Sequence, residues 1–519
     1  MSQSFWDERP SSAAAAPLTL STNSRWVVDE SGKRAKLACV SWPAHMEAMV
    51  PEGLSMQPLD NISKNITAMG FNCVRLTWAL YMLTDDSLGS TTVHQSFQNL
   101  GLNDALAGIQ TNNPQLLKLT VVQAFQAVVS NLASNNIMII IDNHISKPGW
   151  CCSRTDDNGF FGDKDFDPDT WVNGLTKMAT MFKGAPNVVG MSLRNEPRGL
   201  RENPIDWYTY MQKAAEAVHA ASPDFLVILS GLNFDTDLSF LAKKPMEVTF
   251  QGKLVYEMHW YSFSNPTDWE SLSTNQACAN VTNTFITNGV FLLEKGWPVF
   301  FSEFGMDLRG TNENDNKYIS CYLGAAAEHD WDWAVWALQG SYYLRDGLQA
   351  PEEVYGVLSK DWSSPRNQAF LDRLSALQSP FQGPEISNVN PYQVIFHPLS
   401  GLCVWGDPLK LGRCSSPVAW RYTPQKTLVL DSANLCLQAQ GNGQAAKLGA
   451  LRNDSNAIWE LTSDSKMHLS TKLADGSMVC LDADASNNIV TNPCKCLDGD
   501  RACDPTTQWF KIVDSSRQR

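Results

Sequence analysis

The sequence lacks any long apolar run. Its 519 residues contain no stretch of about 18 consecutive apolar residues, so no transmembrane helix is predicted. The first residues, MSQSFWDERPSSAAAAPLTL, also lack the basic start and the apolar core of a signal peptide. We therefore expect a globular chain with no membrane partner, and we interpret Met1 as an added start on a mature chain.

Basic residues are in deficit. The chain carries 40 Lys and Arg against 54 Asp and Glu, which gives a formal net charge of −14 and a pI near 5.1. Nucleic acids and acidic membrane surfaces bind basic proteins, so we expect no nucleic-acid partner. A Gly-rich nucleotide fingerprint is also missing after the first predicted strand, which argues against a dinucleotide-binding fold.

Cysteine and tryptophan, by contrast, are plentiful. Seven of the 13 cysteines follow residue 400, which indicates an oxidising compartment with disulfide bonds. Four glycosylation sequons, at Asn61, Asn65, Asn280 and Asn453, agree with a secreted glycoprotein, although a cytosolic protein is the open alternative. The 18 Trp suit stacking against sugar rings as well as core packing.

Up to about residue 380, apolar runs alternate with amphipathic segments. The segments at 116–134, 168–183, 205–221 and 313–329 have helical patterns. Eight strands with helical crossovers predict an α/β fold, a (β/α)8 TIM barrel, and the alternative is a doubly wound open sheet. The apolar runs lie at 36–42, 72–79, 137–144, 188–196, 225–231, 254–261, 299–305 and 333–340.

The pattern changes after a segment rich in Pro, Gly, Ser and Asn at 379–393, which is typical of a linker. Beyond it, three segments each contain a Cys beside an aliphatic residue and later a Trp near a strand end. Threefold repetition at roughly 40–50 residues predicts an all-β β-trefoil, and the alternative is a generic small β domain. The predicted parts are an N-terminal tail (1–17), the barrel (18–380), a linker (381–391) and the β-trefoil (392–519).

Polar residues interrupt the apolar runs near their C-terminal ends. In a parallel barrel these ends open onto one mouth, so the side chains are expected to converge there. Burying several polar groups is unfavourable unless they are paired. We therefore infer that these polar residues are buried because they have a function. The residues are Arg75, Asn143, His144, Asn195, Glu196, His259, Tyr261, Glu303 and Trp336.

Glu196 and Glu303 come from the fourth and seventh runs, which lie on facing sides of an eight-stranded ring. Two facing carboxylates suit glycosidic cleavage, because one can protonate the leaving oxygen while the other attacks the anomeric carbon or activates water. A separation of roughly 5–5.5 Å between the carboxyl groups predicts retention of configuration, and about 6.5–9.5 Å predicts inversion.

Four motifs carry a family resemblance. LRNEPRG at 193–199, MHWYSF at 258–263, FSEFG at 301–305 and Asn-His at 143–144 resemble glycoside hydrolase family 5, the large cellulase and mannanase family. The chain is similar in particular to plant members with a C-terminal ricin-B-like lectin domain, from about residue 18 onward. The order of the two glutamate motifs, on the fourth and seventh predicted strands, is the specific part of the match.

The resemblance implies a retaining mechanism with Glu196 as acid/base and Glu303 as nucleophile. Asn195 would hydrogen-bond the 2-hydroxyl of the sugar, a contact that strengthens in the transition state. Arg75 would bond Glu303 and keep it ionised. Alternatively, Glu196 would lie in an ordinary solvated loop after a strand, and Arg75 would form a salt bridge that only stabilises the barrel.

The resemblance also assigns supporting residues around this pair. Tyr261 would orient the nucleophile, and His259 would modulate the proton affinity of Glu196. His144 would line the site near Asn195, and Trp336 would form the floor on which the sugar stacks. Alternatively, His144 and His259 would be hydrogen-bonded core histidines, and Trp336 would only pack in the core.

The cysteines and the trefoil leave further expectations. Cys39 and Cys73 are expected to be buried thiols, and the adjacent Cys151 and Cys152 are expected to form separate disulfides rather than a metal site. In the trefoil, Cys403–Cys414 and a bridge from Cys480 to Cys494 or Cys496 are the proposed pairs.

Ricin-type repeats usually carry Gln-x-Trp and an early Asp that binds sugar. Here the Gln positions are Val418, Ala457 and Thr507, and the early Asp survives only as Asp482. Asp482 is therefore the one candidate trefoil sugar site. A purely structural trefoil, with its Trp residues in the core, is the alternative.

We therefore predict a secreted (cell wall or apoplast), monomeric, retaining O-glycosyl hydrolase with a carbohydrate or glycoside substrate and neither metal nor cofactor. It would cleave β-linked glucosyl- or mannosyl-type glycosides or polysaccharides by double displacement through a covalent glycosyl-enzyme. The alternatives are a lectin-like protein with an inactive barrel and a transglycosidase that uses the same residues. The sugar, the aglycone and endo or exo action are left open.

Overall fold

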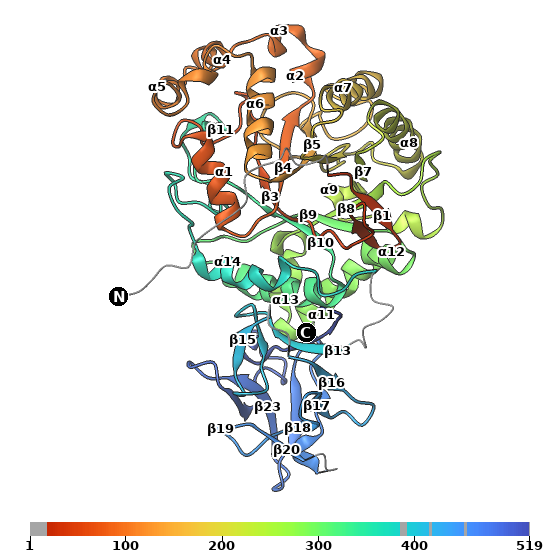
Figure 1. Ribbon diagram of the computed structural model, residues 1–519, viewed down its shortest axis with the longest axis vertical. Helices are drawn as coiled ribbons and strands as arrows, with labels where there is room; N and C mark the ends of the chain where they lie inside the picture. Colours follow the sequence, from red (N-terminus) through yellow and green to blue (C-terminus); the bar gives the residue numbers. More distant parts are fainter. Residues whose placement is uncertain (1–17, 385–391, 415–417, 451–453, 518–519) are drawn as a thin grey trace.

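The N-terminal part of the protein is a closed barrel of eight parallel strands (Figure 1). The computed structural model describes residues 18–384, 392–414, 418–450 and 454–517. The barrel order is β10-β3-β4-β5-β6-β7-β8-β9, and each strand overlaps one predicted apolar run, which confirms the (β/α)8 prediction. The strands are β3 (Ala38–Trp42), β4 (Cys73–Ala79), β5 (Met138–Ile145), β6 (Val188–Ser192), β7 (Leu226–Leu229), β8 (Leu254–Trp260), β9 (Val299–Phe304) and β10 (Asp332–Trp336).

Amphipathic helices cover the outside of the barrel. Their starts are set by capping side chains: Thr120 accepts from the Gln123 amide and Asp167 from the Thr170 amide. No helix in the described ranges combines the length and apolarity that crossing a membrane requires. The main helices are α1 (Leu59–Ala68), α6 (Val121–Ser134), α7 (Pro168–Met181), α8 (Pro204–Ala221), α11 (Thr274–Phe285), α13 (Glu313–His329) and α14 (Gln368–Leu374).

The C-terminal part is all-β and antiparallel, as predicted, and is called the C-terminal β domain below. One sheet orders β15 (Leu411–Arg413), β14 (Leu402–Val404), β13 (Tyr392–His397), β16 (Trp420–Tyr422), β17 (Leu428–Leu430), β18 (Leu435–Gln438) and β20 (Lys447–Ala450), with β25 (Lys511–Ser515) beside β13. The other orders β19 (Gln444–Ala445), β24 (Ile489–Pro493), β23 (Met478–Ala483), β22 (Leu469–Lys472) and β21 (Glu460–Leu461).

The three repeat tryptophans are core residues of this domain, each with no exposed surface. The indole of Trp420 donates to the Val404 carbonyl at 2.9 Å, and that of Trp459 donates to the Leu437 carbonyl at 3.0 Å. The indole of Trp509 departs from this pattern and donates to Asn275 Oδ1 of the barrel domain at 3.0 Å. The third repeat is therefore joined to the barrel.

The C-terminal β domain packs against α11, α13 and α14 on one side of the barrel (Figure 1). Asn275, which is buried at the start of α11, also donates to the Cys496 carbonyl at 2.9 Å and accepts from Ser465 at 2.8 Å. Arg373 of α14 donates to the Pro398 carbonyl at 3.2 Å. These hydrogen bonds are buried, and they join the C-terminal β domain directly to the helices of the barrel domain.

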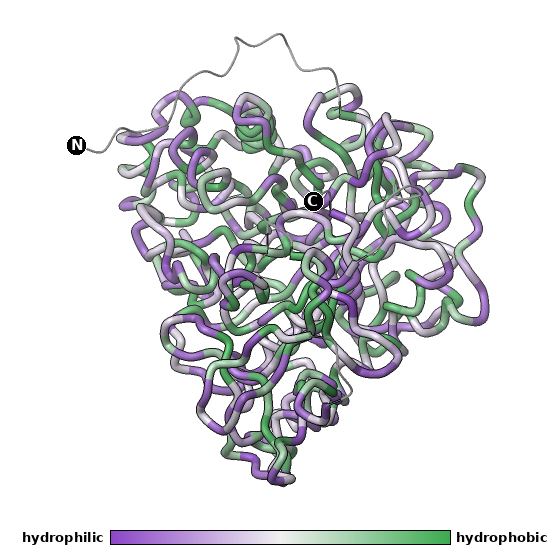
Figure 2. Tube along the Cα trace, turned by 60° about the horizontal axis from the view of Figure 1, so that its bottom comes forward, coloured by the Kyte–Doolittle hydropathy of each residue, from purple (hydrophilic) through white to green (hydrophobic). Residues whose placement is uncertain are grey.

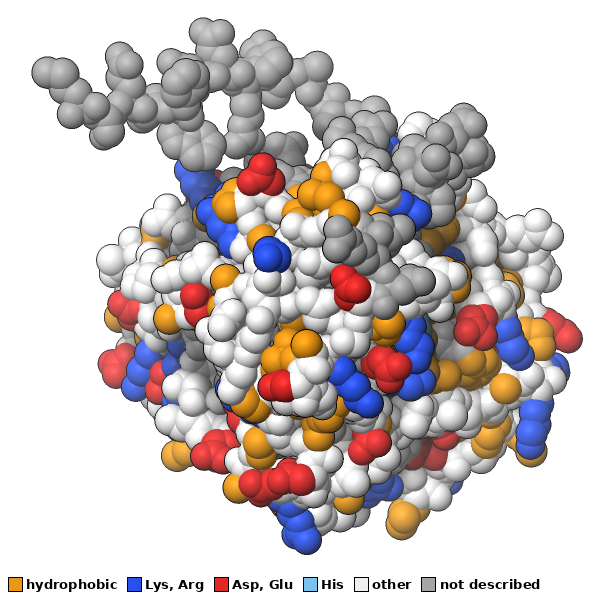
Figure 3. All heavy atoms as spheres, turned by 90° about the horizontal axis from the view of Figure 1, so that it is seen from below, with side chains coloured by type: hydrophobic (Ala, Val, Ile, Leu, Met, Phe, Trp, Pro, Cys, Tyr) orange, Lys and Arg blue, Asp and Glu red, His pale blue; other side chains and the backbone are white. Residues whose placement is uncertain are grey.

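Polar and apolar residues alternate along much of the chain trace, and polar segments mark the outer loops (Figure 2). On the end of the molecule seen from below, acidic and basic side chains lie interspersed (Figure 3). Charges of both signs are therefore mixed on the part of this face that the described residues form.

Two cysteine expectations are wrong. Cys39 and Cys73 form a disulfide, because β3 and β4 are neighbours and their register places these residues opposite each other. Cys151 and Cys152 are bonded to each other instead of to separate partners. The predicted Cys403–Cys414 and Cys480–Cys494 bridges are present, and the remaining bridges are Cys278–Cys321 and Cys496–Cys503.

Candidate active site

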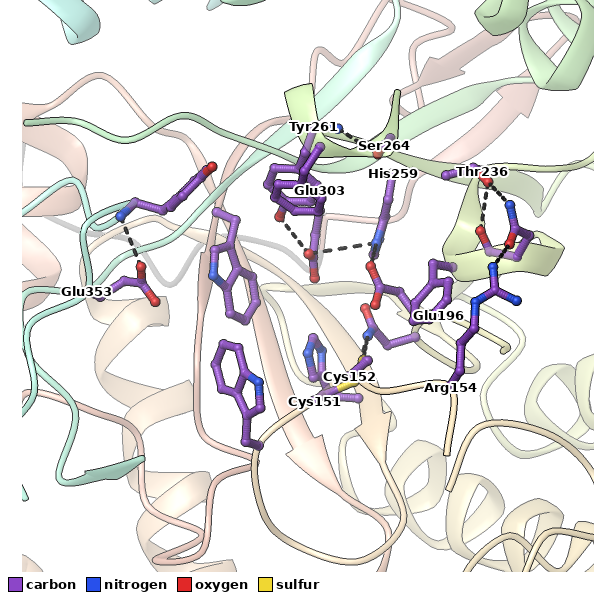
Figure 4. Close-up of a pocket in the computed structure, with 18 of the residues that line it drawn as sticks. Cys151, Cys152, Arg154, Glu196, Thr236, His259, Tyr261, Ser264, Glu303 and Glu353 are labelled. Atoms are coloured by element: carbon purple, nitrogen blue, oxygen red, sulfur yellow. Dashed lines mark hydrogen bonds and ion pairs between the residues drawn. A yellow bond between two sulfur atoms is a disulfide. The ribbon is translucent and has the colours of Figure 1, made fainter. Parts of the chain in front are cut away.

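A pocket of about 490 Å³ opens at the C-terminal ends of the barrel strands. Its lining includes seven of the residues predicted from the sequence, and all of its lining residues fall between His144 and Tyr355, so the C-terminal β domain contributes none. Figure 4 shows Glu196, His259, Tyr261 and Glu303 turned toward one another from different elements. The seven predicted lining residues are His144, Asn195, Glu196, His259, Tyr261, Glu303 and Trp336.

Glu303, on β9, is fixed by two neighbours. Arg75 of β4 donates to Glu303 Oε1 at 2.7 Å, and the Tyr261 hydroxyl donates to Oε2 at 2.8 Å. Arg75 also donates to Asn195 Oδ1 at 2.7 Å and lies 3.1 Å from Asp142. Although burial lowers the pKa of Arg75, the attraction of Asp142 and Glu303 outweighs it and raises that pKa, so the guanidinium stays charged.

Glu196 follows β6 in the left-handed region, with φ of 45°. Its backbone amide donates to Asp235 Oδ2 at 3.0 Å, and its carboxylate bonds His259 Nδ1 at 2.9 Å. The other ring nitrogen of His259 bonds the Ser302 hydroxyl at 3.0 Å. A strained backbone held by a buried side chain is a common feature of functional sites.

The two glutamates face each other across a short gap. One carboxylate oxygen of Glu196, one of Glu303 and a ring nitrogen of His259 all lie within 4.8 Å of one another. At this approach the two carboxyl groups are near enough to act on the same glycosidic bond. The pair can therefore flank one anomeric carbon.

The two glutamates differ in the charged and polar groups around them. Burial raises the pKa of Glu196 to about 7, against the opposing charges of Arg198 and Arg75. Burial also raises the pKa of Glu303, but His259, Arg75 and the Tyr261 hydroxyl all favour its ionised form. This difference suits a proton donor at Glu196 and an anionic nucleophile at Glu303.

His144 and Trp336 form one wall of the pocket. Their rings stack with centroids 5.4 Å apart, and the ring centroid of His45 lies 3.9 Å from that of His144 and 6.4 Å from that of Trp336. His144 Nδ1 bonds Asp142 Oδ2 at 2.6 Å, and burial lowers the pKa of His144 well below its usual value. Asn143 lies outside the pocket, where its Oδ1 accepts from the Trp171 indole at 3.1 Å.

Two groups of side chains have the spacing of metal ligands within the described residues. In the first, Cys151 and Cys152 join Glu196, but both sulfurs are committed to a disulfide. The second is Glu196, His259 and Glu303, where both Glu303 oxygens already accept hydrogen bonds and the Arg75 charge lies against them. Neither group offers a free set of anionic ligands for a divalent ion.

Several candidate functional residues near the pocket are not among those predicted from the sequence. Three of them are buried acids: Asp142 forms an ion pair with Arg75, Asp235 accepts from the Glu196 amide, and Glu257 accepts from the Ser192 hydroxyl. Asp142 could have been found as a charged residue inside an apolar run, beside the Asn143–His144 motif. Asp235 lies in an irregular turn, and nothing in the sequence connects it with Glu196.

Asp482, the candidate sugar site of the C-terminal β domain, is 3% exposed. Its Oδ2 accepts from Asn492 at 3.1 Å and from Gln508 at 3.0 Å, and its Oδ1 accepts from the Ala483 amide. A sugar at this carboxylate would compete with those bonds. Sugar binding at Asp482 stays a prediction.

Comparison with known proteins agrees with this geometry. The family model described as "Cellulase (glycosyl hydrolase family 5)" matches residues 28–341, more than half of the chain. A protein of Chamaecyparis obtusa, described as "Glycosyl hydrolase 5 family protein", is 45% identical over 97% of this chain and 95% of its own length. A (β/α)8 barrel with two facing glutamates thus defines a glycosidase, and the chain belongs to glycoside hydrolase family 5.

More distant relatives and solved structures share the barrel. An endoglucanase of Paenibacillus polymyxa is 22% identical over 46% of this chain and 59% of its own length. The solved endocellulase of Pyrococcus horikoshii covers 70% of this chain and 99% of its own with a TM-score of 0.57 at 18% identity. The catalytic domain of the major endoglucanase of Xanthomonas campestris covers 69% of this chain and 99% of its own, with a TM-score of 0.55 at 20% identity. These structures support the fold.

Proposed function

We propose that the protein is a retaining β-glycoside hydrolase that acts by double displacement, with Glu303 as nucleophile and Glu196 as acid/base. The observation that carries the proposal is the facing pair itself, whose carboxylate oxygens lie within 4.8 Å. The inferred substrates are β-linked glucosyl- or mannosyl-type glycosides or polysaccharides. The endoglucanase names of the distant relatives favour the glucosyl member of this class.

In the first step, Glu303 attacks the anomeric carbon while Glu196 donates its proton to the leaving oxygen. The C–O bond to the leaving group breaks, and an ester bond forms between the sugar and Glu303. Arg75 and Tyr261 hold the two Glu303 oxygens, so the attacking oxygen needs little reorganisation. Asn195, held by Arg75, faces the 2-hydroxyl.

In the second step, the ionised Glu196 takes a proton from water, and the water oxygen attacks the anomeric carbon from the opposite face. The ester bond to Glu303 breaks, and the sugar leaves with its original β configuration. His259 bonds Glu196 throughout this cycle and helps to hold its carboxyl group at the correct angle. Trp336 supplies the stacking surface for the ring being cleaved.

We also propose that the protein works outside the cell. Six disulfides within the described residues support an oxidising compartment. They include the buried Cys39–Cys73 bridge between two barrel strands.

A mechanism-based inhibitor tests the proposed roles. A 2-deoxy-2-fluoro β-glucoside or β-mannoside with an activated leaving group slows the second step, so the glycosyl-enzyme accumulates. Peptide mass spectrometry is expected to find one sugar on the peptide that contains Glu303. A label elsewhere would overturn the assignment of the nucleophile.

Substitutions separate the enzyme from its alternatives. Glu303→Ala is expected to abolish turnover of aryl β-glycosides while sugar binding persists, and added azide is expected to restore product as the α-glycosyl azide. Turnover of no β-glycoside by the wild-type protein would favour the lectin-like alternative. Products longer than the substrate, formed at high acceptor concentration, would favour the transglycosidase.

A further inference from the structure

The Cys151–Cys152 disulfide lies in the active-site pocket. Both residues line it, and Figure 4 shows the disulfide near Glu196. None of the other disulfides in the described chain contributes to this lining. The loop that carries the pair follows β5 and His144, and Cys151 itself is 7% exposed. A bridge between adjacent residues closes no long loop, so the entropic gain of a cross-link does not explain it.

The first contact of this disulfide is with Asn195. Asn195 Oδ1 accepts from Arg75 at 2.7 Å, which turns the amide nitrogen toward the sulfurs. Nδ2 lies 3.7 Å from Cys151 Sγ and 3.7 Å from Cys152 Sγ. Sulfur is a weak acceptor, so the two N–H groups of Asn195 have little hydrogen-bond energy to lose when a sugar hydroxyl arrives. An oxygen acceptor at the same place would compete with the substrate.

The second contact is with Glu196. A sulfur atom of each cysteine and a carboxylate oxygen of Glu196 lie within 4.8 Å of one another. A disulfide is uncharged and too poor a hydrogen-bonding group to replace water at a carboxylate. It therefore covers one side of the Glu196 carboxyl without solvating its ionised form, and burial is the largest cause of the raised pKa of Glu196.

Charged groups face Glu196 from the other sides. Arg75 and Arg198 favour its ionised form, while Asp142 and Asp156 oppose it. His259 bonds its carboxylate, and Asp235, Glu303 and Tyr261 are the remaining titratable neighbours. Most of these groups belong to β4, β5, β8, β9 and the loops after β6 and β7. Arg198, however, also donates to the Ser153 carbonyl and to Asp156, which lie in the same loop as the disulfide. The test therefore compares two variants that both lack the bridge and differ only in polarity.

We propose that the Cys151–Cys152 disulfide is a positioning element for the reaction: it keeps the Asn195 amide free for the substrate and keeps the Glu196 carboxyl unsolvated and able to donate a proton. This inference rests on the proposed roles of Glu196 and Asn195. It assigns a function to a feature that the glutamate chemistry itself does not need.

The test compares two double variants. Cys151→Ser with Cys152→Ser places hydroxyl groups beside Asn195 and Glu196, whereas Cys151→Ala with Cys152→Ala removes the bridge but stays apolar. In the serine variant, the basic limb of the profile of kcat/KM against pH is expected to shift to lower pH by about one unit. In the alanine variant, the shift is expected to be much smaller. With a poor leaving group, the serine variant should also lose kcat by about tenfold or more, while an activated aryl leaving group is affected little because it needs no proton.

The matched control is Cys403→Ser with Cys414→Ser, which removes a bridge far from the pocket and is expected to leave the pH profile unchanged. The proposal would be overturned if the serine variant lost kcat equally with both leaving groups and kept the wild-type pH profile. It would also be overturned if the serine and alanine variants gave the same pH profile and the same kcat values. If the variants do not fold, reduction of the native protein by a dithiol, with the opened cysteines identified by alkylation, must shift the same limb. An inactive wild-type protein would instead contradict the proposed function itself.

Discussion

At the scale of single residues, the account depends on the proton of Glu196. Its pKa of about 7 results chiefly from burial, against the charges of Arg198 and Arg75. The protonated form is present below about pH 7, so activity toward substrates with poor leaving groups is expected to fall as the pH rises through 7. Glu196→Gln, compared with the wild type on the same poor-leaving-group substrate, should keep only a low residual rate whose pH profile lacks this limb. A limb that persists in Glu196→Gln would assign the titration to another group.

The same burial means that the ionised form of Glu196 lowers the free energy of unfolding. Below pH 4.5 the carboxyl is neutral in both the folded and the unfolded chain, and above pH 7 it must ionise in a poorly solvated site. A shift from 4.5 to about 7 corresponds to about 3 kcal/mol. Glu196→Gln is therefore expected to raise the free energy of unfolding by up to this amount at pH 8 and by almost nothing at pH 4. Denaturant titrations at the two pH values check this, and an equal effect at both would contradict it.

At the scale of elements, the turn after β7 supports Glu196. Asn233, Phe234 and Asp235 have φ of 51°, 59° and 59°, in the left-handed region that residues other than Gly adopt rarely. This conformation brings the buried Asp235 carboxylate to the Glu196 amide at 3.0 Å. The strain of the turn is thus linked to the position of the proton donor.

Asp235→Ala is expected to lower kcat at least tenfold and to destabilise the protein by about 1–3 kcal/mol, because the buried Glu196 amide loses its acceptor. Asp235→Asn keeps an acceptor oxygen and should restore most of both quantities. Steady-state kinetics and thermal unfolding of the two variants separate these results. An alanine variant with wild-type kcat would show that the turn does not position Glu196.

The elements themselves were largely predictable, whereas their cross-connections were not. The barrel strands are apolar runs because both of their faces are buried, and this pattern is visible in one dimension. The Cys39–Cys73 bridge depends on the register of β3 against β4, which a single sequence does not encode. Similarly, Glu196 and Glu303 were identifiable from their motifs, but the Asp235 support arises only when the turn after β7 reaches the loop after β6.

At the scale of the whole molecule, the C-terminal β domain is joined to the barrel through Asn275. This one side chain satisfies the Trp509 indole, the Cys496 carbonyl and the Ser465 hydroxyl, all in the buried interface. The pocket receives no lining residue from this domain. The hydrogen bonds of Asn275 are therefore expected to contribute to the stability of the folded protein and not to the catalytic rate.

Asn275→Ala leaves the buried Trp509 indole and Cys496 carbonyl without their partner, which is expected to cost about 2–4 kcal/mol of stability. The kcat of the folded protein on a small aryl glycoside should stay unchanged. Differential scanning calorimetry with kinetics well below the transition measures both quantities. Asn283→Ala, an exposed position on the same helix, is the matched control. A loss of kcat without a loss of stability in Asn275→Ala would contradict the separation.

The central claim is that Glu196 and Glu303 act from opposite sides of one anomeric carbon in two successive displacements. The most direct measurement is proton NMR of the sugar released from an aryl β-glycoside in the first minutes, before mutarotation mixes the anomers. The account predicts that the β anomer appears first and the α anomer only later. Initial release of the α anomer would contradict it, because a single displacement by water inverts the configuration.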